Sequence, residues 1–389
     1  MRTLSGCGTV VVSGSLAQRP GIGGHAWVFL QYLLGFKRLG FDVLFLDWLN
    51  DKMCIDAAGR PCPIEDSWNL EYLSEVMHQC GLDDAWSLDY GHGEKTFGVS
   101  REAVLAKTKG ADLLLNVMGF LSDVEILERP QRRVFLDIDP GFGQMWQDLG
   151  WATMFRGHDT YVTIGENIGH PDCTIPTCGL NWITSPQPVV LDQWPAHDSG
   201  IHAAFTSIAT WRGPFAPIEY RGKTYGLRVH EFRKFAALPR SSPDKFNLAL
   251  EIDPIEVKDL AMLSANGWRL LNPREVAGTI SGYREFIQQS KAELLIAKNI
   301  YVDTRGGWVS DRSLCYLASG KPVLAQDTGF GRRYPTGAGL LKFSTFEEAA
   351  AGVKEISADY GRHSRAARAI AEEHFDSNKV LTRLLERVQ

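Results

Sequence analysis

The chain has 389 residues, of which 44% are hydrophobic and 22% are charged, and its formal net charge is −5. This length is too great for one compact core and suits two domains of about 180 residues each. The composition is that of a globular protein, and the negative charge gives no electrostatic reason to expect a nucleic-acid partner. No apolar run reaches the length of about 18 residues that a membrane span needs, so none is expected.

The start of the chain and the cysteines indicate the cellular setting. Residues 1–8 lack a cationic region followed by an apolar run, so no secretory signal is expected. The seven cysteines are scattered, and no Cys-x-x-Cys pair occurs. This pattern indicates neither a zinc site nor a disulfide framework. We therefore expect a cytoplasmic protein without a metal site.

The first half opens with a strand, a glycine turn and a helix. Residues 9–16 form a β-branched run typical of a buried parallel strand, and residues 20–24 (Pro-Gly-Ile-Gly-Gly) lead into an apolar helix that ends near residue 39. Residues 41–48 predict the second strand of a βαβ unit, which a right-handed crossover places in a parallel sheet. Further strands are predicted at 111–117, 133–139 and 160–164, with helices at 68–80 and 122–129.

A proline-rich, aperiodic segment at residues 185–200 predicts a linker to a second α/β series. In that series we expect strands at 205–210, 246–252, 269–271, 294–297 and 323–325, and helices at 257–265, 280–290, 346–359 and 362–373. Val380, Leu384 and Leu385 follow at helical spacing, in a tail expected to pack back on the first half. The predicted units are thus 1–190, 200–373 and a returning segment at 374–389.

The stretch at residues 305–327 is the most informative part of the sequence. It predicts a glycine-rich turn, a short helix and a buried strand. Gly306 and Gly307 permit a tight turn and the close approach of a ligand. Ser310 is placed to cap the helix, whose free N–H groups suit a phosphate or diphosphate. An ordinary connection within an α/β domain is the alternative interpretation.

Two α/β halves, a returning C-terminal helix and this glycine-rich helix start resemble the GT-B glycosyltransferases. Residues 305–310 (Arg-Gly-Gly-Trp-Val-Ser) are similar to the His-Gly-Gly-x-x-Ser diphosphate-binding turn of nucleotide-sugar enzymes. Residues 316–323 look like the helix end and strand that follow it in that family. The resemblance implies an α/β fold of two Rossmann-like domains that face each other across a cleft, with a nucleotide sugar as co-substrate and no other cofactor.

The branch of the family stays open. Gly307 and Cys315 stand where the retaining branch usually carries two glutamates. The plant-like inverting signature is not matched either, because the predicted helix after Ser310 runs about two residues longer before Gly320 than that signature allows. The sequence therefore leaves retention and inversion as alternatives.

A nucleotide-sugar donor leaves as a nucleoside diphosphate, whose developing negative charge the site must stabilise. The residues that the sequence offers for the donor are Gly23, Gly24, Arg212, Lys298, Arg305, Gly306, Gly307, Ser310, Asp311, Arg312, Gln326 and Asp327. The four cations among them can hold a diphosphate without a metal. Asp311 is suited to a ribose or sugar hydroxyl, or to the first-turn charge of the helix. Gln326 and Asp327 fall where the family contacts the sugar, and Gly23 and Gly24 can approach the diphosphate from the other domain.

An acceptor hydroxyl that attacks with inversion needs a general base. His25 follows the glycine turn at a helix start, where the helix dipole lowers a histidine's pKa and favours the neutral form. Asp139, after a predicted strand, is the rival base, and Glu166 is a third option. A hydrogen-bonded cap is the alternative role for His25.

The acceptor loops, at about 50–66 and 86–100, carry no recognisable signature. Trp48, Trp86, Tyr90 and Trp146 are suited either to a sugar-binding pocket or to the core.

The preferred prediction is a metal-independent glycosyltransferase that acts on a small-molecule or glycan acceptor. A catalytically inactive GT-B protein that binds a nucleotide sugar, and a sugar epimerase on the same scaffold, are alternatives. An NAD-dependent oxidoreductase is a weaker one: Asp47 ends the second strand as a ribose-binding carboxylate would, but the full G-x-G-x-x-G spacing is missing.

Overall fold

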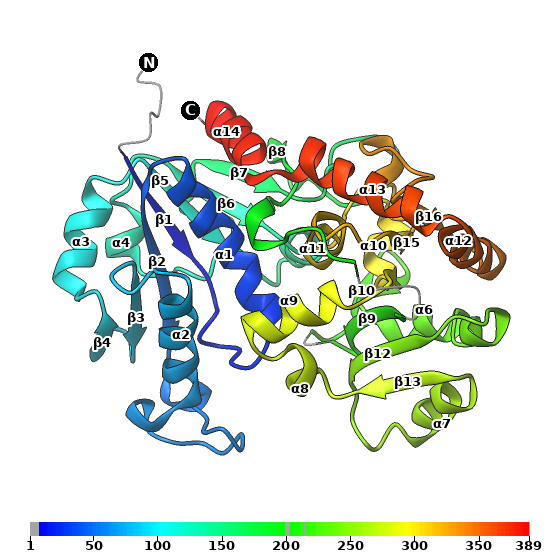
Figure 1. The fold of residues 1–389 in the computed structure, drawn as a ribbon. Helices are drawn as coiled ribbons and strands as arrows, with labels where there is room; N and C mark the ends of the chain where they lie inside the picture. Colours follow the sequence, from blue (N-terminus) through cyan, green and yellow to red (C-terminus); the bar gives the residue numbers. More distant parts are fainter. Residues whose placement is uncertain (1–7, 199–202, 214, 389) are drawn as a thin grey trace.

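The computed structural model describes residues 8–198, 203–213 and 215–388 (Figure 1). Residues 1–7, where no secretory signal was expected, and residues 199–200 at the end of the predicted linker lie outside the described residues. Two separate sheets, each accompanied by helices, form the two halves of the molecule. Within the described ranges, no helix is long and apolar enough to cross a membrane.

The first sheet has eight strands in the order β4-β3-β2-β1-β5-β6-β7-β8. All neighbours pair in parallel except β3 and β4. The strands are β1 (Thr9–Ser13), β2 (Asp42–Leu49), β3 (Trp86–Tyr90), β4 (Lys95–Gly98), β5 (Leu113–Val117), β6 (Arg133–Asp137), β7 (Thr160–Thr163) and β8 (Trp182–Thr184). The helices of this half are α1 (Gly23–Arg38), α2 (Trp68–Gln79), α3 (Arg101–Lys109), α4 (Val124–Leu127) and α5 (Phe142–Asp148).

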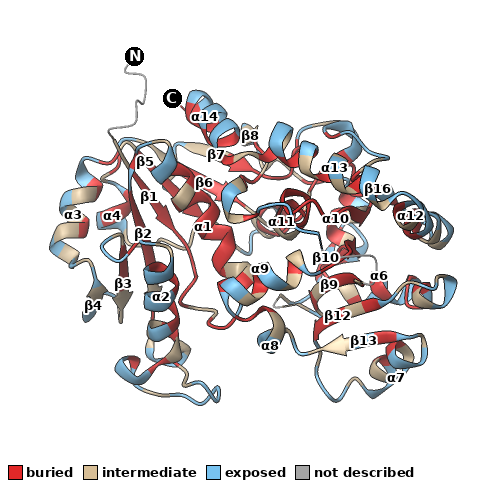
Figure 2. Cartoon of the chain, in the orientation of Figure 1, coloured by how far each residue is buried: buried red, intermediate tan, exposed pale blue. Residues whose placement is uncertain are grey.

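Strand β1 is apolar on both faces because helices cover the sheet from both sides. Val10 and Val12 join the core cluster that includes the buried face of α1, whereas Val11 joins the cluster under α3 and α4. Successive side chains of a strand point to opposite faces, so a central strand covered on both sides needs a continuous β-branched run. Figure 2 shows this buried centre in red.

The second sheet has six parallel strands in the order β13-β12-β9-β14-β15-β16. They are β9 (Phe205–Thr210), β12 (Phe246–Glu251), β13 (Trp268–Leu271), β14 (Ala292–Leu295), β15 (Val323–Gln326) and β16 (Leu340–Phe343), and β10 (Ile218–Tyr220) with β11 (Lys223–Tyr225) forms a separate hairpin. The helices are α6 (Arg228–Lys234), α7 (Val257–Ala265), α8 (Pro273–Ala277), α9 (Ile280–Gln288), α10 (Asn299–Thr304), α11 (Asp311–Ala318), α12 (Phe346–Ala358), α13 (Tyr360–Ile370) and α14 (Ser377–Val388).

The predicted strands and helices of both halves are present, within the usual uncertainty of their ends. The sequence analysis missed a set of mostly short elements: β3, β4, β8, β16, the β10–β11 hairpin, α3, α5, α6, α8 and α10. Most of these span too few residues for a periodic pattern. Helix α3 is longer, but only Val104 and Thr108 are buried on it, so its apolar stripe is too thin to recognise.

The C-terminal helix α14 packs on α1 of the first half. Leu381 lies over Gly35 of α1, where an added Cβ would come within 2.5 Å of the leucine Cδ1. The segment predicted as a linker runs alongside: the Val189 N–H donates to the Phe375 carbonyl at 2.7 Å, and the Ser377 N–H donates back to Val189 at 2.9 Å. Val189 and Trp194 are fully buried, so this part of the connection is packed into the protein, whereas residues 195–198 are exposed.

Replacing Leu381 by alanine tests the contribution of this packing. The side chain is fully buried, so its loss leaves a cavity between α14 and α1. We expect the free energy of unfolding in urea to fall by about 2–5 kcal/mol. Arg383→Ala, on the exposed face of the same helix, is the control and should change it little. Equal effects of the two substitutions would contradict the packing of α14 on α1.

Candidate active site in the cleft between the two sheets

The carboxyl ends of the two sheets meet at a cavity of about 440 Å³. In each sheet the strand order reverses at one point, between β1 and β5 and between β9 and β14. The loops that follow these strands diverge to opposite faces and leave a crevice, which is where open α/β sheets bind ligands. The lining comes from both halves, with the loops after β1, β5 and β6 on one side and those after β9, β12 and β14 on the other.

Five cations line this cavity: Arg19, Arg228, Arg274, Lys298 and Arg312. Burial, together with the positive charge of Arg312, lowers the pKa of Arg228 to about 10, against the opposing effect of Asp139 and Glu293. Among the described residues Arg228 makes no ion pair, and its Nε has no hydrogen-bond partner. A desolvated cation without a partner is costly, and an anionic ligand would offset that cost.

Lys298 lines the same space and directly precedes α10. Its Nζ lies 4.8 Å from the ring centre of Phe142 and 5.6 Å from that of Tyr301, and its pKa is lowered by burial. The nearest carboxylate is Asp139, at 3.9 Å from Nζ. The ammonium group is therefore held by ring faces and one distant carboxylate.

Arg312 differs from Arg228 because its charge is already compensated. Its Nε donates to the Glu293 carboxylate at 2.6 Å, and Nη1 donates to the Ile208 carbonyl at 2.7 Å. Glu293 is completely buried. Arg312 therefore lines the cavity with its geometry fixed by the sheet behind it, in β14 and β9.

Helix α11 begins at the cavity, and Ser310 and Asp311 line it. The Ser310 hydroxyl donates to the Asp311 carboxylate at 3.3 Å and makes no cap hydrogen bond to the helix backbone. The prediction that Ser310 is the N-cap is confirmed, although its side chain does not bond to the helix backbone. The first N–H groups of the helix have no intrahelical partner, so this end carries partial positive charge.

His25 lies in the first turn of α1 and lines the cavity from the opposite side. Its Nε2 lies 3.0 Å from the Ser15 carbonyl oxygen and 3.1 Å from the Ser15 hydroxyl. Because a carbonyl oxygen can only accept, we assign the hydrogen to Nε2, which leaves Nδ1 as the basic nitrogen. Burial, assisted by the charge of Arg19, lowers the pKa of His25 to about 4. The imidazole is therefore neutral at physiological pH.

Asp139, in the loop after β6, also lines the cavity. Burial raises the pKa of its carboxyl, and the charges of Lys298, Arg19 and Arg228 act in the opposite direction. The structure thus brings both predicted bases, His25 and Asp139, into the same cavity as Lys298.

The glycine-rich turn before α11 packs closely against another segment of the protein and does not face the cavity. A Cβ on Gly307 would come within 2.8 Å of the Asn167 side chain, and one on Gly306 within 2.8 Å of Ile175. Asn167 donates to the carbonyls of Arg305 and Gly329, both at 3.1 Å. Neither glycine lines the cavity, so the turn joins the second half to the loop after β7.

Several other predicted site residues also lie outside the cavity. Arg305 is half exposed and reaches Asp327 only at 4.0 Å, and Asp327 pairs with Lys342 at 3.2 Å. Gln326 is buried, where it bonds to the Ala297 N–H and to Glu231.

Three more candidates have partners of their own. Arg212 is exposed and pairs with Glu256. Gly23 packs against the backbone of Thr279, whose carbonyl oxygen would lie 2.2 Å from a Cβ added to the glycine. Its neighbour Gly24 does line the cavity. Glu166, the third candidate base, is bonded to the Tyr334 hydroxyl, away from the cleft.

Asp47, on which the oxidoreductase alternative depended, does not line the cleft. Its carboxylate accepts hydrogen bonds at 2.7 Å from the N–H groups of Ala17 and Trp48. It therefore fixes the loop that follows β1.

The sequence analysis missed Arg19 and Arg228. Arg19 directly precedes the predicted glycine turn, and its position after a first strand was a usable signal. Arg228 follows a hairpin and starts a helix that had not been predicted, in a segment without a motif. No local pattern marks it.

Comparison with solved structures shows that this is the GT-B fold. An α-glucosyltransferase in complex with UDP-glucose and DNA containing an abasic site aligns with a TM-score of 0.61 at 12% identity, over 98% of this chain and 99% of that one. Sucrose-phosphate synthase from Thermosynechococcus elongatus gives 0.56 at 10% identity, over 98% and 100%. HepE from Anabaena in complex with UDP gives 0.54 at 12% identity, over 98% and 99%. No family model matches the sequence, and no curated protein matches it significantly.

The protonation of His25 can be measured by NMR. The folded pKa near 4 lies below the ordinary 6.5, so between these values the unfolded chain binds a proton that the folded protein does not. The stability contributed by His25 is therefore lost as the pH falls through this window. We expect the ring signal, assigned by its loss in His25→Gln, to titrate near pH 4. A midpoint near 6.5 would contradict the buried environment described here.

Proposed function

We propose that the protein is a nucleotide-sugar-dependent glycosyltransferase, with the donor bound in the cleft between the two sheets. The observation that carries this proposal is the unpaired, desolvated Arg228 beside Lys298, in a cavity that also receives the start of α11. A diphosphate supplies negative charge and oxygen acceptors to Arg228, whose Nε has no hydrogen-bond partner among the described residues.

In this proposal Arg228, Lys298 and the start of α11 hold the diphosphate. Arg312 adds a cation whose orientation Glu293 fixes. Asp311 lies in the same lining and is suited to accept from a hydroxyl of the sugar or ribose. Because these cations supply the positive charge that a leaving diphosphate needs, we propose that transfer does not require a metal.

The acceptor would enter from the first half, where His25 and Asp139 are placed. For an inverting reaction, the acceptor hydroxyl attacks the anomeric carbon while the bond to the diphosphate breaks. Nδ1 of His25 or the carboxylate of Asp139 takes the hydroxyl proton. If the enzyme is retaining, the same residues orient the acceptor and the sugar instead.

The alternatives are less well supported by the geometry. An oxidoreductase is disfavoured because Asp47 binds backbone N–H groups outside the cleft. A nucleotide-sugar-binding protein without activity and an epimerase both share the donor site. Release of free nucleotide that depends on an added acceptor separates a transferase from both.

A thermal-shift screen with UDP, GDP and TDP tests the donor site. We expect one of them to stabilise the protein, and Arg228→Met to weaken its binding at least tenfold, since a charge-assisted hydrogen bond contributes about 1.5–3 kcal/mol. The unliganded variant should unfold at the same temperature or higher, because the substitution removes a buried charge without a partner.

Arg212→Met is the matched control for this prediction. Arg212 lies in the same half but is exposed and paired outside the cavity, so the substitution should leave nucleotide affinity unchanged. Stabilisation by none of the three nucleotides, or equal losses in the two variants, would overturn the proposed donor site. Arg312→Ala is a poorer probe, since it leaves buried Glu293 unpaired at a cost of about 3–5 kcal/mol.

The base can be identified by separating donor binding from turnover. We expect His25→Ala to bind the nucleotide as the wild type does and to lose transfer by about a hundredfold or more, the usual contribution of a general base. Nucleotide binding controls for folding. If His25→Ala turns over normally and Asp139→Asn does not, Asp139 is the base.

A further inference from the structure

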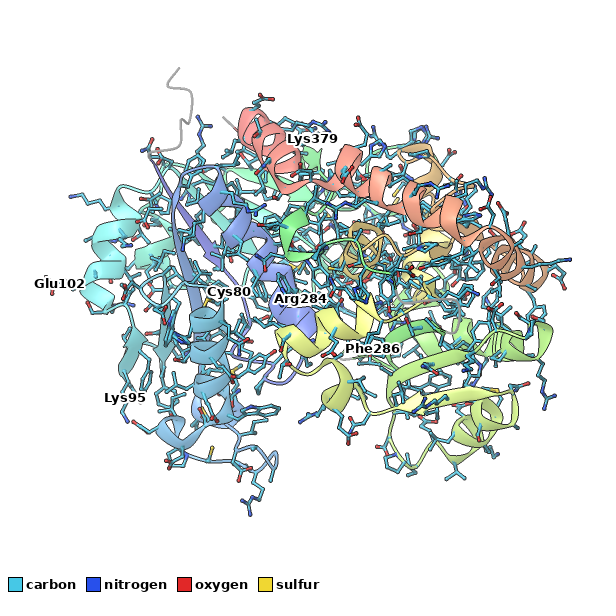
Figure 3. All side chains as sticks on the ribbon, in the orientation of Figure 1. Cys80, Lys95, Glu102, Arg284, Phe286 and Lys379 are labelled. Carbon is cyan, nitrogen blue, oxygen red and sulfur yellow. The ribbon has the colours of Figure 1, made fainter. Side chains whose placement is uncertain are left out.

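A second cavity, of about 280 Å³, lies in the first half beside the cleft. It is enclosed by the ends of β2 and β3, by β4 and α3, and by the loop between β5 and α4. In Figure 3, Lys95 on β4 and Glu102 on α3 mark the side of the molecule where it lies. Phe120 lines both this cavity and the cleft, so the two spaces are neighbours across one side chain.

One wall of this cavity is an aromatic platform. Trp48 and His92 stack with their ring centres 5.7 Å apart and their planes at 25°. His92 holds its ring there from a left-handed backbone conformation with φ of 58°. The indole Nε1 of Trp48 is buried and has no hydrogen-bond partner among the described residues. The wall thus offers a flat apolar face together with an unused donor.

The polar groups of the cavity leave one carboxylate oxygen without a hydrogen bond. The Arg101 guanidinium is engaged by Asp123 at 2.8 Å and by Glu125 at 2.9 Å. Asp89, by contrast, has an Oδ1 atom that is buried and without a partner in the described part of the chain. Burial raises the pKa of this carboxyl group. An acceptor atom of this kind favours a ligand that donates hydrogen bonds, and it opposes a phosphate or carboxylate ligand.

We propose that this cavity binds the acceptor and that the acceptor is a neutral, hydroxyl-rich ring such as a sugar. The ring would lie on the Trp48–His92 face, with its hydroxyls donating to Asp89. Hydroxyl groups both donate and accept, which suits the unused carboxylate and the unused indole N–H together.

This assignment rests on the proposed glycosyl transfer, because the acceptor must reach the donor past Phe120. The attacking hydroxyl forms its bond to the anomeric carbon of the donor sugar as the bond from that carbon to the diphosphate breaks. The hydroxyl proton passes to the base in the cleft, and the nucleoside diphosphate leaves with the electron pair.

The test follows the Trp48 indole N–H signal by NMR in ¹⁵N-labelled protein, assigned by its loss in Trp48→Phe. The probes are the methyl glycosides of glucose, galactose and mannose at millimolar concentration, with glucose 6-phosphate as the anionic comparison. We expect at least one glycoside to shift the signal saturably and the phosphate to bind more weakly. The absence of any shift with all three glycosides, or tighter binding of the phosphate, would overturn the proposal.

Two variants show whether the named residues bind the sugar. Asp89→Asn and His92→Asn should each weaken the responding glycoside at least fivefold; asparagine keeps the left-handed backbone at His92 accessible. Asp84→Asn, an exposed carboxylate before β3, is the control and should have no effect. His92 is exposed, so its substitution does not threaten folding even if that of Asp89 does. Unchanged affinity in folded His92→Asn protein would refute the aromatic platform.

Nucleotide binding on the same samples separates this inference from the proposed function. If nucleotide binds and no glycoside does, the donor site stands and the acceptor cavity is wrong. If a glycoside shifts the Trp48 signal and no nucleotide binds, the cavity is a sugar site and the proposed transfer fails.

Discussion

Close packing of helix α1 against the second half is the constraint on which the cleft depends (Figure 1). An added Cβ on Gly24 would lie 2.8 Å from the Tyr283 ring, and one on Gly35 2.5 Å from Leu381. The Trp27 indole donates to the Ile280 carbonyl at 3.0 Å between these two points. Larger side chains would push α9 and α14 away from α1, and His25 would then lose its fixed distance from the opposing wall.

The charges of the cleft divide into those that hold the structure and those left for a ligand. Arg312 is paired with buried Glu293, so the role of this pair in the free protein is to fix geometry. Arg228 makes no ion pair among the described residues, and Lys298 has only Asp139, at 3.9 Å. Such groups lower stability in the free protein, and sites of function commonly carry that cost. The contrast explains why the donor proposal depends on Arg228 rather than on the motif arginines.

The glycine-rich turn shows how a motif can be located correctly while its neighbours stay unknown. Gly306 and Gly307 do permit a close approach, but the approaching group in the structure is the loop that carries Asn167. A missing Cβ gives space to a phosphate and to an asparagine side chain alike. Only Ser310 onward reaches the cavity. The sequence could therefore place the helix start but not the partner of the turn in front of it.

The sequence by itself determined the two α/β series, the returning C-terminal helix and the GT-B outline, because strand and helix periods and turn residues are local properties. It also named His25, Asp139 and Lys298, which stand where strands end or helices begin. The tertiary structure alone decided which charges are paired and which are buried without a partner. Arg228 illustrates the reason: its neighbours Arg312, Asp139 and Glu293 are distant in sequence, and electrostatic interaction depends on distance and burial in space.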